Sequence, residues 1–132
     1  MANTIQTDLV APERKLASVQ ASEIRIPSTD GELTVMPGHA PLITTLKPGK
    51  LTIVADGVST DYAVTGGFAE ISPDSVSILA ERSLPANEFT PEVHAEMVEE
   101  ARKEHEDAHP SVADMTAKML ADMEALGSHM LG

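Results

Sequence analysis

The sequence contains no cysteine and very few aromatic residues. The absence of cysteine excludes disulfide bonds, thiolate zinc sites and cysteine nucleophiles. Tyr62, Phe68 and Phe89 are the only tyrosine, phenylalanine or tryptophan residues among 132 positions, so we expect an aliphatic core. Basic residues are also scarce, at 9 against 21 acidic ones, and the formal net charge is −12. This charge disfavours binding to nucleic acid or to an anionic membrane surface.

Long apolar segments are missing as well. No run of apolar residues approaches the length of a membrane-spanning helix, and the first residues lack the charged and then apolar layout of a secretory signal. We therefore expect a soluble, cytoplasmic protein. The length fits one domain, or one domain with a small appendage, and the apolar fraction of 42% is typical of a globular protein.

The composition changes near residue 87. Residues 1–87 hold seven of the nine prolines and six of the eight glycines, whereas residues 88–132 hold five of the seven methionines. The first segment predicts strands joined by turns, and the second predicts helices. The β-rich runs are Thr4–Val10, Lys15–Ala21, Glu23–Pro27, Glu32–Met36, Leu51–Ala55, Ser59–Thr65, Phe68–Ile71 and Val76–Ala80. Many short strands at this spacing are typical of an antiparallel sandwich or barrel.

Proline and capping residues predict two helices in the second segment. Thr90 and Pro91 form a good helix start, because threonine can cap the first turn and proline fits into it. Pro110 ends this helix. Ser111 opens a second helix, with Asp114 at the capping-box position.

Apolar residues recur at spacings of three and four along both predicted helices. The positions are Val93, Met97, Val98 and Ala101 in the first helix, and Val112, Met115, Met119, Met123, Leu126 and Met130 in the second. Gly127 and Gly132 mark the C-terminal end of the second helix. Two amphipathic helices with a short connection predict an antiparallel helical hairpin.

The segment from His105 to His109 matches the zinc-binding pattern H-E-x-x-H. On a helix, this spacing places two imidazoles on one face for zinc, with the glutamate as the base. Pro110 follows directly and disfavours a helical conformation at His109. We therefore favour a solvated helix end and expect no metal and no cofactor. The sequence also has no G-x-x-x-x-G-K-[ST] loop and no G-x-S-x-G motif, so we expect a non-catalytic protein.

Several sequence blocks carry a family resemblance. The run from Asp30 to Leu51 contains PGHAPL at residues 37–42, and GGFAEI at Gly66–Ile71 and VSILAE at Val76–Glu81 follow it. Near the start, Asp8-Leu9-Val10 and then Pro12-Glu13 fit the same pattern. At these mutual spacings, the blocks closely resemble the signature of the epsilon subunit of F-type ATP synthases. The likeness covers the chain from end to end.

The resemblance implies a ten-stranded antiparallel β-sandwich in residues 1–86 and a two-helix antiparallel hairpin in residues 87–132. It implies a non-catalytic subunit of the rotor, or central stalk, of a proton-translocating bacterial ATP synthase. Such a subunit contacts gamma and the ring of c subunits, helps to couple proton flow to ATP synthesis, and reaches the alpha and beta subunits through its C-terminal helices. It also implies a peripheral position at the cytoplasmic face of the inner membrane, with membrane association only through the complex.

The same resemblance implies interface residues by position. Glu32 falls where the sandwich of the family meets polar loops of the c-ring. His39, Thr44, Thr65 and Glu70 fall at positions that face gamma. The alternative for each is an ordinary surface residue of a sandwich.

The helical segment departs from parts of the family pattern. Members that bind ATP carry Ile/Leu-Asp-x-x-Arg-Ala early in the first helix, whereas this chain has PEVHA at Pro91–Ala95. Lys118 is the one basic residue of the second helix, where strongly inhibitory members carry several. We therefore expect weak inhibition and assign no nucleotide site. The other functional classes are an unrelated sandwich-plus-hairpin adaptor and a small metalloenzyme that uses His105 and His109.

Overall fold

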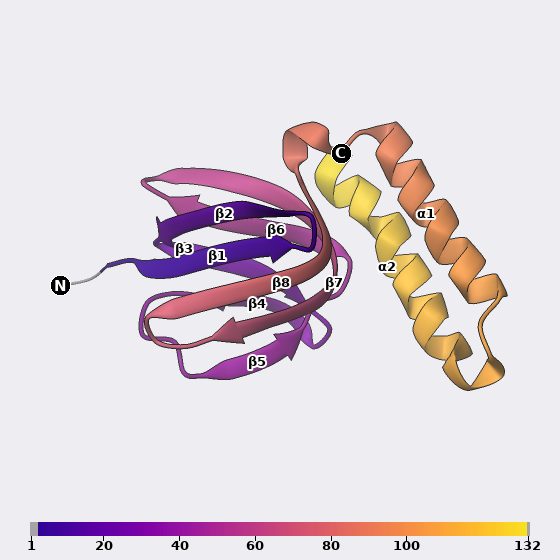
Figure 1. Ribbon diagram of the computed structural model, residues 1–132, viewed down its shortest axis with the longest axis horizontal. Coiled ribbons are helices and arrows are strands. Elements are labelled where there is room, and N and C mark those ends of the chain that lie inside the picture. Colours follow the sequence, from indigo (N-terminus) through magenta and orange to yellow (C-terminus); the bar gives the residue numbers. More distant parts are fainter. Residues whose placement is uncertain (1–2, 132) are drawn as a thin grey trace.

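The computed structural model describes residues 3–131 and shows a β-sandwich followed by two antiparallel helices (Figure 1). The strands are β1 (Ile5–Ala11), β2 (Arg14–Ala21), β3 (Glu23–Ser28), β4 (Gly31–Val35), β5 (Leu42–Thr45), β6 (Gly49–Ala55), β7 (Val58–Ile71) and β8 (Ser75–Pro85). The helical part consists of the 3-10 turn η1 (Ala86–Glu88), α1 (Pro91–Glu106), the 3-10 turn η2 (Pro110–Val112) and α2 (Ala113–Leu131). Within the described residues, neither α1 nor α2 combines the length and apolar character needed to cross a bilayer.

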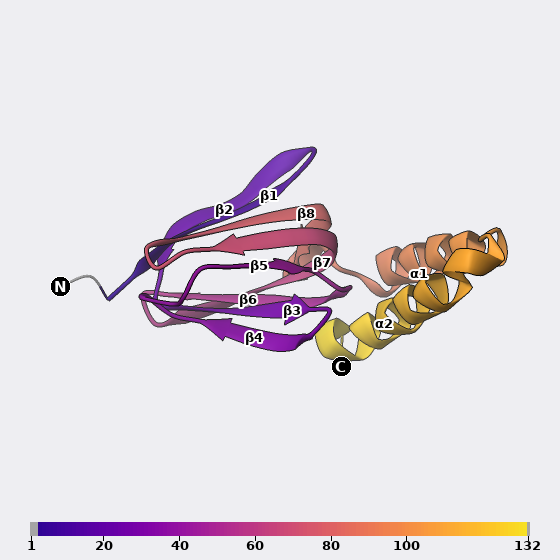
Figure 2. The same cartoon turned by 90° about the horizontal axis from the view of Figure 1, so that it is seen from below.

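The strands form one sheet that folds over on itself into two layers. Their order is β2-β1-β8-β7-β6-β3-β4, and β5 pairs with β7 outside this path. Figure 2 shows β2, β1 and β8 in one layer and β6, β3 and β4 in the other. The pairing is antiparallel throughout, except between β1 and β8, which run parallel.

An aliphatic core fills the space between the layers, as expected from the shortage of aromatic residues. Alternation along β1 directs Ile5, Thr7 and Leu9 inward, and the Thr7 hydroxyl is satisfied because it donates to the Ile5 carbonyl at 3.1 Å. The largest fully buried side chains of this core are those of Ile5, Leu9, Ile24, Ile26, Leu51, Ile71 and Ile78. Burial of such side chains contributes about 1.5–3 kcal/mol each, so this core dominates the stability of the sandwich.

The described residues form eight strands, so the count of ten is not confirmed. β7 is 14 residues long and pairs with β6 through its first part and with β5 through its second part. The segments predicted separately at Ser59–Thr65 and Phe68–Ile71 are therefore one strand. Gly66 and Gly67 have φ angles of 41° and 100°, and they let β7 bend without ending.

The residue pattern does not predict the strand β5. Leu42 and Ile43 are neighbours in the strand and both are exposed, so β5 shows no alternation of apolar and polar residues. Its place in the fold comes from pairing instead, because Ile43 lies opposite Glu70 and Thr45 opposite Phe68.

The predicted start of α1 is confirmed, whereas the predicted start of α2 is not. The Thr90 hydroxyl accepts a hydrogen bond from the Val93 amide at 3.2 Å, and Pro91 is the first helical residue. At the second helix, the Ser111 amide donates to His109 Nδ1 at 3.1 Å. His109 therefore caps η2 in place of the expected Ser111, and α2 begins only at Ala113.

The C-terminal part of the hairpin packs against the sandwich. A second core contains Ala63 of β7 and Phe89, together with Met97, Ala101, Met123 and Leu126 of the helices. The predicted stripes are therefore buried near the sandwich, but Met115, toward the hairpin tip, is 59% exposed. Gly127 lies inside α2 rather than at its end, and Gly132 lies outside the described residues.

Candidate interaction surface

Three large apolar side chains lie on the outer face of β5, β7 and β8. Ile43, Phe68 and Leu79 are 68%, 43% and 45% exposed, respectively. Phe68 lies directly opposite Leu79, and Ile43 lies opposite Glu70, two residues further along β7. We call these three side chains the outer patch. Adjacent exposed apolar side chains of this size are typical of an interaction surface.

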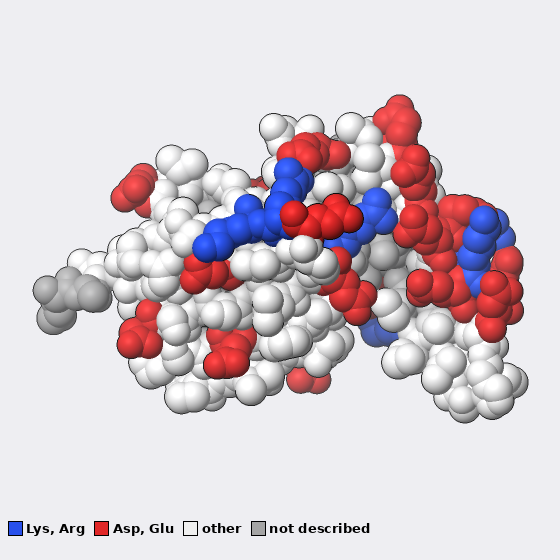
Figure 3. Space-filling model, in the orientation of Figure 1, with Lys and Arg blue, Asp and Glu red and all other residues white. Residues whose placement is uncertain are grey.

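Charge is distributed unevenly around the outer patch. Figure 3 shows uncharged atoms with a few separate acidic groups over the lower strands of the sandwich, whereas acidic side chains crowd the surface of α1. A surface with few charges loses less hydration when a partner covers it, so the sandwich face is better suited to close packing than the α1 face.

Glu70 lies beside the outer patch, opposite Ile43, and His39 precedes β5 in the chain. His39 belongs to the loop between β4 and β5, and the amide of its neighbour Gly38 donates to the Pro73 carbonyl at 2.8 Å. This bond ties the loop to the turn between β7 and β8. The His39 Nδ1 atom lies 2.7 Å from the Ala40 carbonyl, which can only accept, so Nδ1 carries a hydrogen. Glu70 is exposed between Ile43 and Ser77.

Thr44 and Thr65 lie on the same strands, but their side chains are nearly covered. They are 8% and 7% exposed, respectively. The Thr44 hydroxyl lies 2.6 Å from the Ser28 hydroxyl, a hydrogen bond that links β5 to the end of β3. Thr65 lies opposite Arg82 on β8. In the free chain, these two threonines therefore support the strands behind the interaction surface and present little of themselves to a partner.

Glu32 is separate from the other matched residues. It is exposed at the start of β4, the last strand of the sheet path, where it lies opposite Pro27. It lines a depression of about 210 Å³ with Lys47, Lys50 and His129. The fold thus places Glu70 next to the outer patch, His39 in the loop between β4 and β5, and Glu32 in a different, more polar setting.

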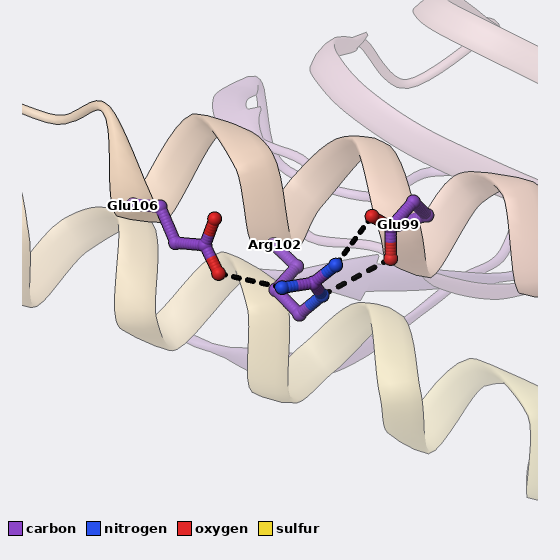
Figure 4. A network of polar contacts seen from close by, with 3 residues as sticks. All are labelled: Glu99, Arg102 and Glu106. Atoms are coloured by element: carbon purple, nitrogen blue, oxygen red, sulfur yellow. Dashed lines mark hydrogen bonds and ion pairs between the residues drawn. The ribbon is translucent and has the colours of Figure 1, made fainter.

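Arg102 on α1 is held by two acidic residues of its own helix (Figure 4). Its guanidinium contacts Glu99, with Nε at 3.0 Å from Oε2, and Nη1 lies 2.5 Å from Glu106 Oε1. The hydrogen bond to Glu99 and the negative charge of Glu106 raise the pKa of Arg102 above its ordinary value. These contacts pair the guanidinium with acidic groups of its own helix.

The two histidines of the zinc-like pattern are not arranged as a metal site. α1 ends at Glu106, so His109 does not share a helix with His105. His105 Nδ1 lies 2.8 Å from the Thr116 hydroxyl, and His109 Nδ1 lies 2.8 Å from the Ser111 hydroxyl. Across residues 3–131, no group of three or more His, Cys, Asp or Glu side chains is placed to hold a metal.

The outer patch was not predicted from the sequence, although the alternation of its residues with buried neighbours could have indicated it. Phe68 alternates with the buried Ala69, and Leu79 with the buried Ile78 and Ala80. The period of two therefore placed both side chains on the outside, and their apolar character was the unusual feature.

Comparisons with known proteins agree across the whole chain. Residues 4–86 match the family described as ATP synthase, Delta/Epsilon chain, beta-sandwich domain. The chain is 62% identical over 130 residues to the ATP synthase epsilon chain of Rhodobacter capsulatus, with 98% of both chains covered. It is 54% identical over 137 residues to the ATP synthase epsilon chain of Paracoccus denitrificans, with 98% of this chain and 93% of that relative covered.

A solved structure shares the fold. In a cryo-EM structure of the Euglena gracilis mitochondrial ATP synthase, containing OSCP, F1 and the c-ring, one chain superposes with a TM-score of 0.73. The sequence identity is 25%, and the match covers 96% of this chain and 81% of that chain. These matches include both the sandwich and the helices, so they do not favour an unrelated adaptor. They confirm the resemblance seen in the sequence blocks: the chain belongs to the family of ATP synthase epsilon chains.

Proposed function

We propose that this epsilon chain is a non-catalytic subunit of the central stalk of a proton-translocating bacterial ATP synthase. It couples proton flow to ATP synthesis through contacts with gamma and with the ring of c subunits. It lies peripherally at the cytoplasmic face of the inner membrane and is held there only through the complex. Its partners are gamma, the c-ring and, through the C-terminal helices, the alpha and beta subunits.

The observation that carries this proposal is the outer patch of Ile43, Phe68 and Leu79, beside which Glu70 lies exposed opposite Ile43. Covering an exposed apolar side chain contributes about 1.5–3 kcal/mol when burial is complete. Glu70, opposite Ile43, and His39, in the loop before β5, supply polar groups that can fix the orientation of gamma. Thr44 and Thr65 contribute indirectly, because they position the strands that carry the outer patch.

Glu32 is proposed to face the c-ring. Its carboxylate is exposed at the β3–β4 hairpin, beside a depression that Lys47, Lys50 and His129 also line. A polar setting of this kind suits polar loops better than an apolar partner, because rim charges mainly set orientation and association rate.

The hairpin is proposed to regulate ATP hydrolysis only weakly. Residues 88–132 carry 11 acidic and 3 basic side chains, and Arg102 is already engaged by Glu99 and Glu106. Acidic surfaces repel other acidic surfaces, so the hairpin lacks the charge needed to clamp acidic segments of a beta subunit.

The substitution Phe68→Glu tests the proposed gamma contact. A carboxylate placed within a buried apolar contact loses its hydration without a partner, so binding to purified gamma should weaken by about tenfold or more. Val58→Glu is the matched control, because Val58 is also exposed and apolar but lies at the far end of β7. Titration calorimetry with gamma measures both variants. Unchanged affinity in Phe68→Glu, or an equal loss in Val58→Glu, contradicts the assignment.

A further inference from the structure

Gly127 of α2 faces the imidazole ring of His94 on α1. A Cβ atom placed on Gly127 would lie 2.4 Å from His94 Cε1 and 2.8 Å from His94 Nδ1. No side chain fits there unless the ring moves. The backbone of Gly127 does not have a positive φ angle, so no turn requires glycine at this position. Glycine inside a helix normally lowers helix stability relative to alanine. The ring therefore explains why glycine is suited to this site.

The His94 ring is also held by a hydrogen bond to the opposite helix. Its Nε2 atom lies 2.8 Å from the Met123 carbonyl oxygen. A carbonyl can only accept, so Nε2 carries the hydrogen and donates. The ring lies near Phe89 as well, with centroids 5.6 Å apart and the planes tilted by 56°. His94 thus contacts the linker before α1 and one turn of α2 at the same time.

These contacts lie where the hairpin joins the sandwich. Phe89 and Met123 belong to the second core, in which Leu126 is fully buried and Ala63 comes from β7. Among the described residues, one other side-chain hydrogen bond links the helices, between His105 and Thr116 toward the hairpin tip. Separation of α2 from α1 at the sandwich end would have to withdraw the ring, break its bond to Met123 and expose Leu126.

We propose that His94 and Gly127 form a latch that keeps α2 closed against α1 and the sandwich without any bound ligand. The notch at Gly127 receives the ring, and the Met123 carbonyl fixes its orientation. The latch controls how often the C-terminal half of α2 detaches. This inference rests on the fold alone and does not depend on the proposed function.

Hydrogen exchange of α2 backbone amides in the full chain tests the latch. Gly127→Ala should raise the exchange rates in the C-terminal half of α2, residues 122–131, by roughly tenfold, because the new methyl group displaces the ring. In the His94→Ala background, the same Gly127→Ala change should slow exchange, since alanine favours the helix and no ring opposes it. Ser128→Ala is the control. It also raises helix propensity, one residue further along an exposed part of α2, and should not accelerate exchange.

The decisive result is that Gly127→Ala accelerates α2 exchange in the parent chain but slows it in the His94→Ala background. If Gly127→Ala leaves exchange unchanged or slows it in the parent chain, the latch is wrong. If Gly127→Ala accelerates exchange equally with and without His94, crowding by another group is responsible and the latch is again wrong. Amides of Ile24 and Ile53 in the sandwich report whether each variant remains folded. Should Gly127→Ala unfold the chain, His94→Ala alone decides: faster α2 exchange supports the latch, and unchanged exchange overturns it.

Discussion

Tyr62 lies directly opposite Pro85, the last residue of β8, at the point where the chain leaves the sandwich. On its other side, Tyr62 lies opposite Leu51 of β6. It is the only tyrosine of the chain and is 8% exposed. Burial raises the pKa of its phenol above the ordinary value, because the phenolate would lose its hydration. This single ring therefore reports on the junction between the sandwich and the helical segment.

The stability of the chain should fall as the pH rises above about 10. The folded state keeps the Tyr62 proton to a higher pH than the unfolded state does. The stabilisation is fully present below the unfolded pKa and is lost as the pH rises through the folded pKa. Denaturant unfolding of the parent and of Tyr62→Phe, at neutral and alkaline pH, measures this. The phenylalanine variant should lose less stability with alkali, and an identical loss would contradict the assignment.

Residues 1–86 should fold without the helices. The members of the main core, among them Ile5, Ile24 and Val64, all come from the sandwich. Circular dichroism and thermal melting of this fragment should show strand structure and one cooperative transition. The melting temperature should be lower than that of the full chain, because removal of the helices uncovers Ala63 and Leu84. A fragment without a cooperative transition would show that the two segments do not fold independently.

Combined substitution of His39→Trp and Glu70→Lys should weaken binding to gamma. Glu70 lies opposite Ile43 of the outer patch, and His39 is proposed to contact gamma as well, so the change alters charge at one position and shape at the other. We expect a loss of about 1 kcal/mol or more in binding free energy, measured by calorimetry. Glu104→Lys on α1 reverses a charge elsewhere and should have no such effect. A double variant that melts like the parent and binds gamma equally well would reject this placement.

Deletion of residues 88–132 should leave ATP hydrolysis by the reconstituted complex little changed. The acidic hairpin lacks the basic residues that would hold it against acidic partner segments, and Arg102 is held by its own helix. The isolated full chain should also show no micromolar ATP binding by calorimetry. A several-fold increase in hydrolysis after the deletion, or measurable micromolar binding, would show that the hairpin has a stronger regulatory role.

Local chemistry predicted several elements correctly. The strand predicted at Thr4–Val10, the Thr90 cap and the short link before α2 all depend on residues close together in the sequence. Long-range packing was harder to predict. The 3-10 turn before α2 is capped by the ring nitrogen of His109, a residue type that is not among the usual caps. The sequence predicts a helix end at Gly127. The structure instead places this residue inside α2, where the His94 ring of the other helix leaves no room for a Cβ atom.

For the proposed interaction surface too, local sequence pointed to individual residues but not to how they pack. Sequence blocks pointed to His39 and Glu70, and the fold places Glu70 opposite Ile43 of the outer patch and His39 in the loop before β5. The sequence could not reveal that Thr44 is covered, because this depends on Ser28, a residue of another strand. Glu32 was assigned to the c-ring interface only by its position in the family pattern. Its separation from the outer patch follows from the order of strands in the sheet.

The parallel pairing of β1 with β8 has a consequence for synthesis of the chain. Gln6 lies opposite Ser75, so β1 cannot complete its pairing until most of the chain has left the ribosome. The β1–β2 hairpin emerges first, with one edge of β1 unpaired and the apolar face of Ile5 and Leu9 uncovered. Such non-local closure makes folding slow and leaves a temporary strand edge open to other chains. Nascent chains that stall before β8 are therefore the form of this protein most exposed to aggregation.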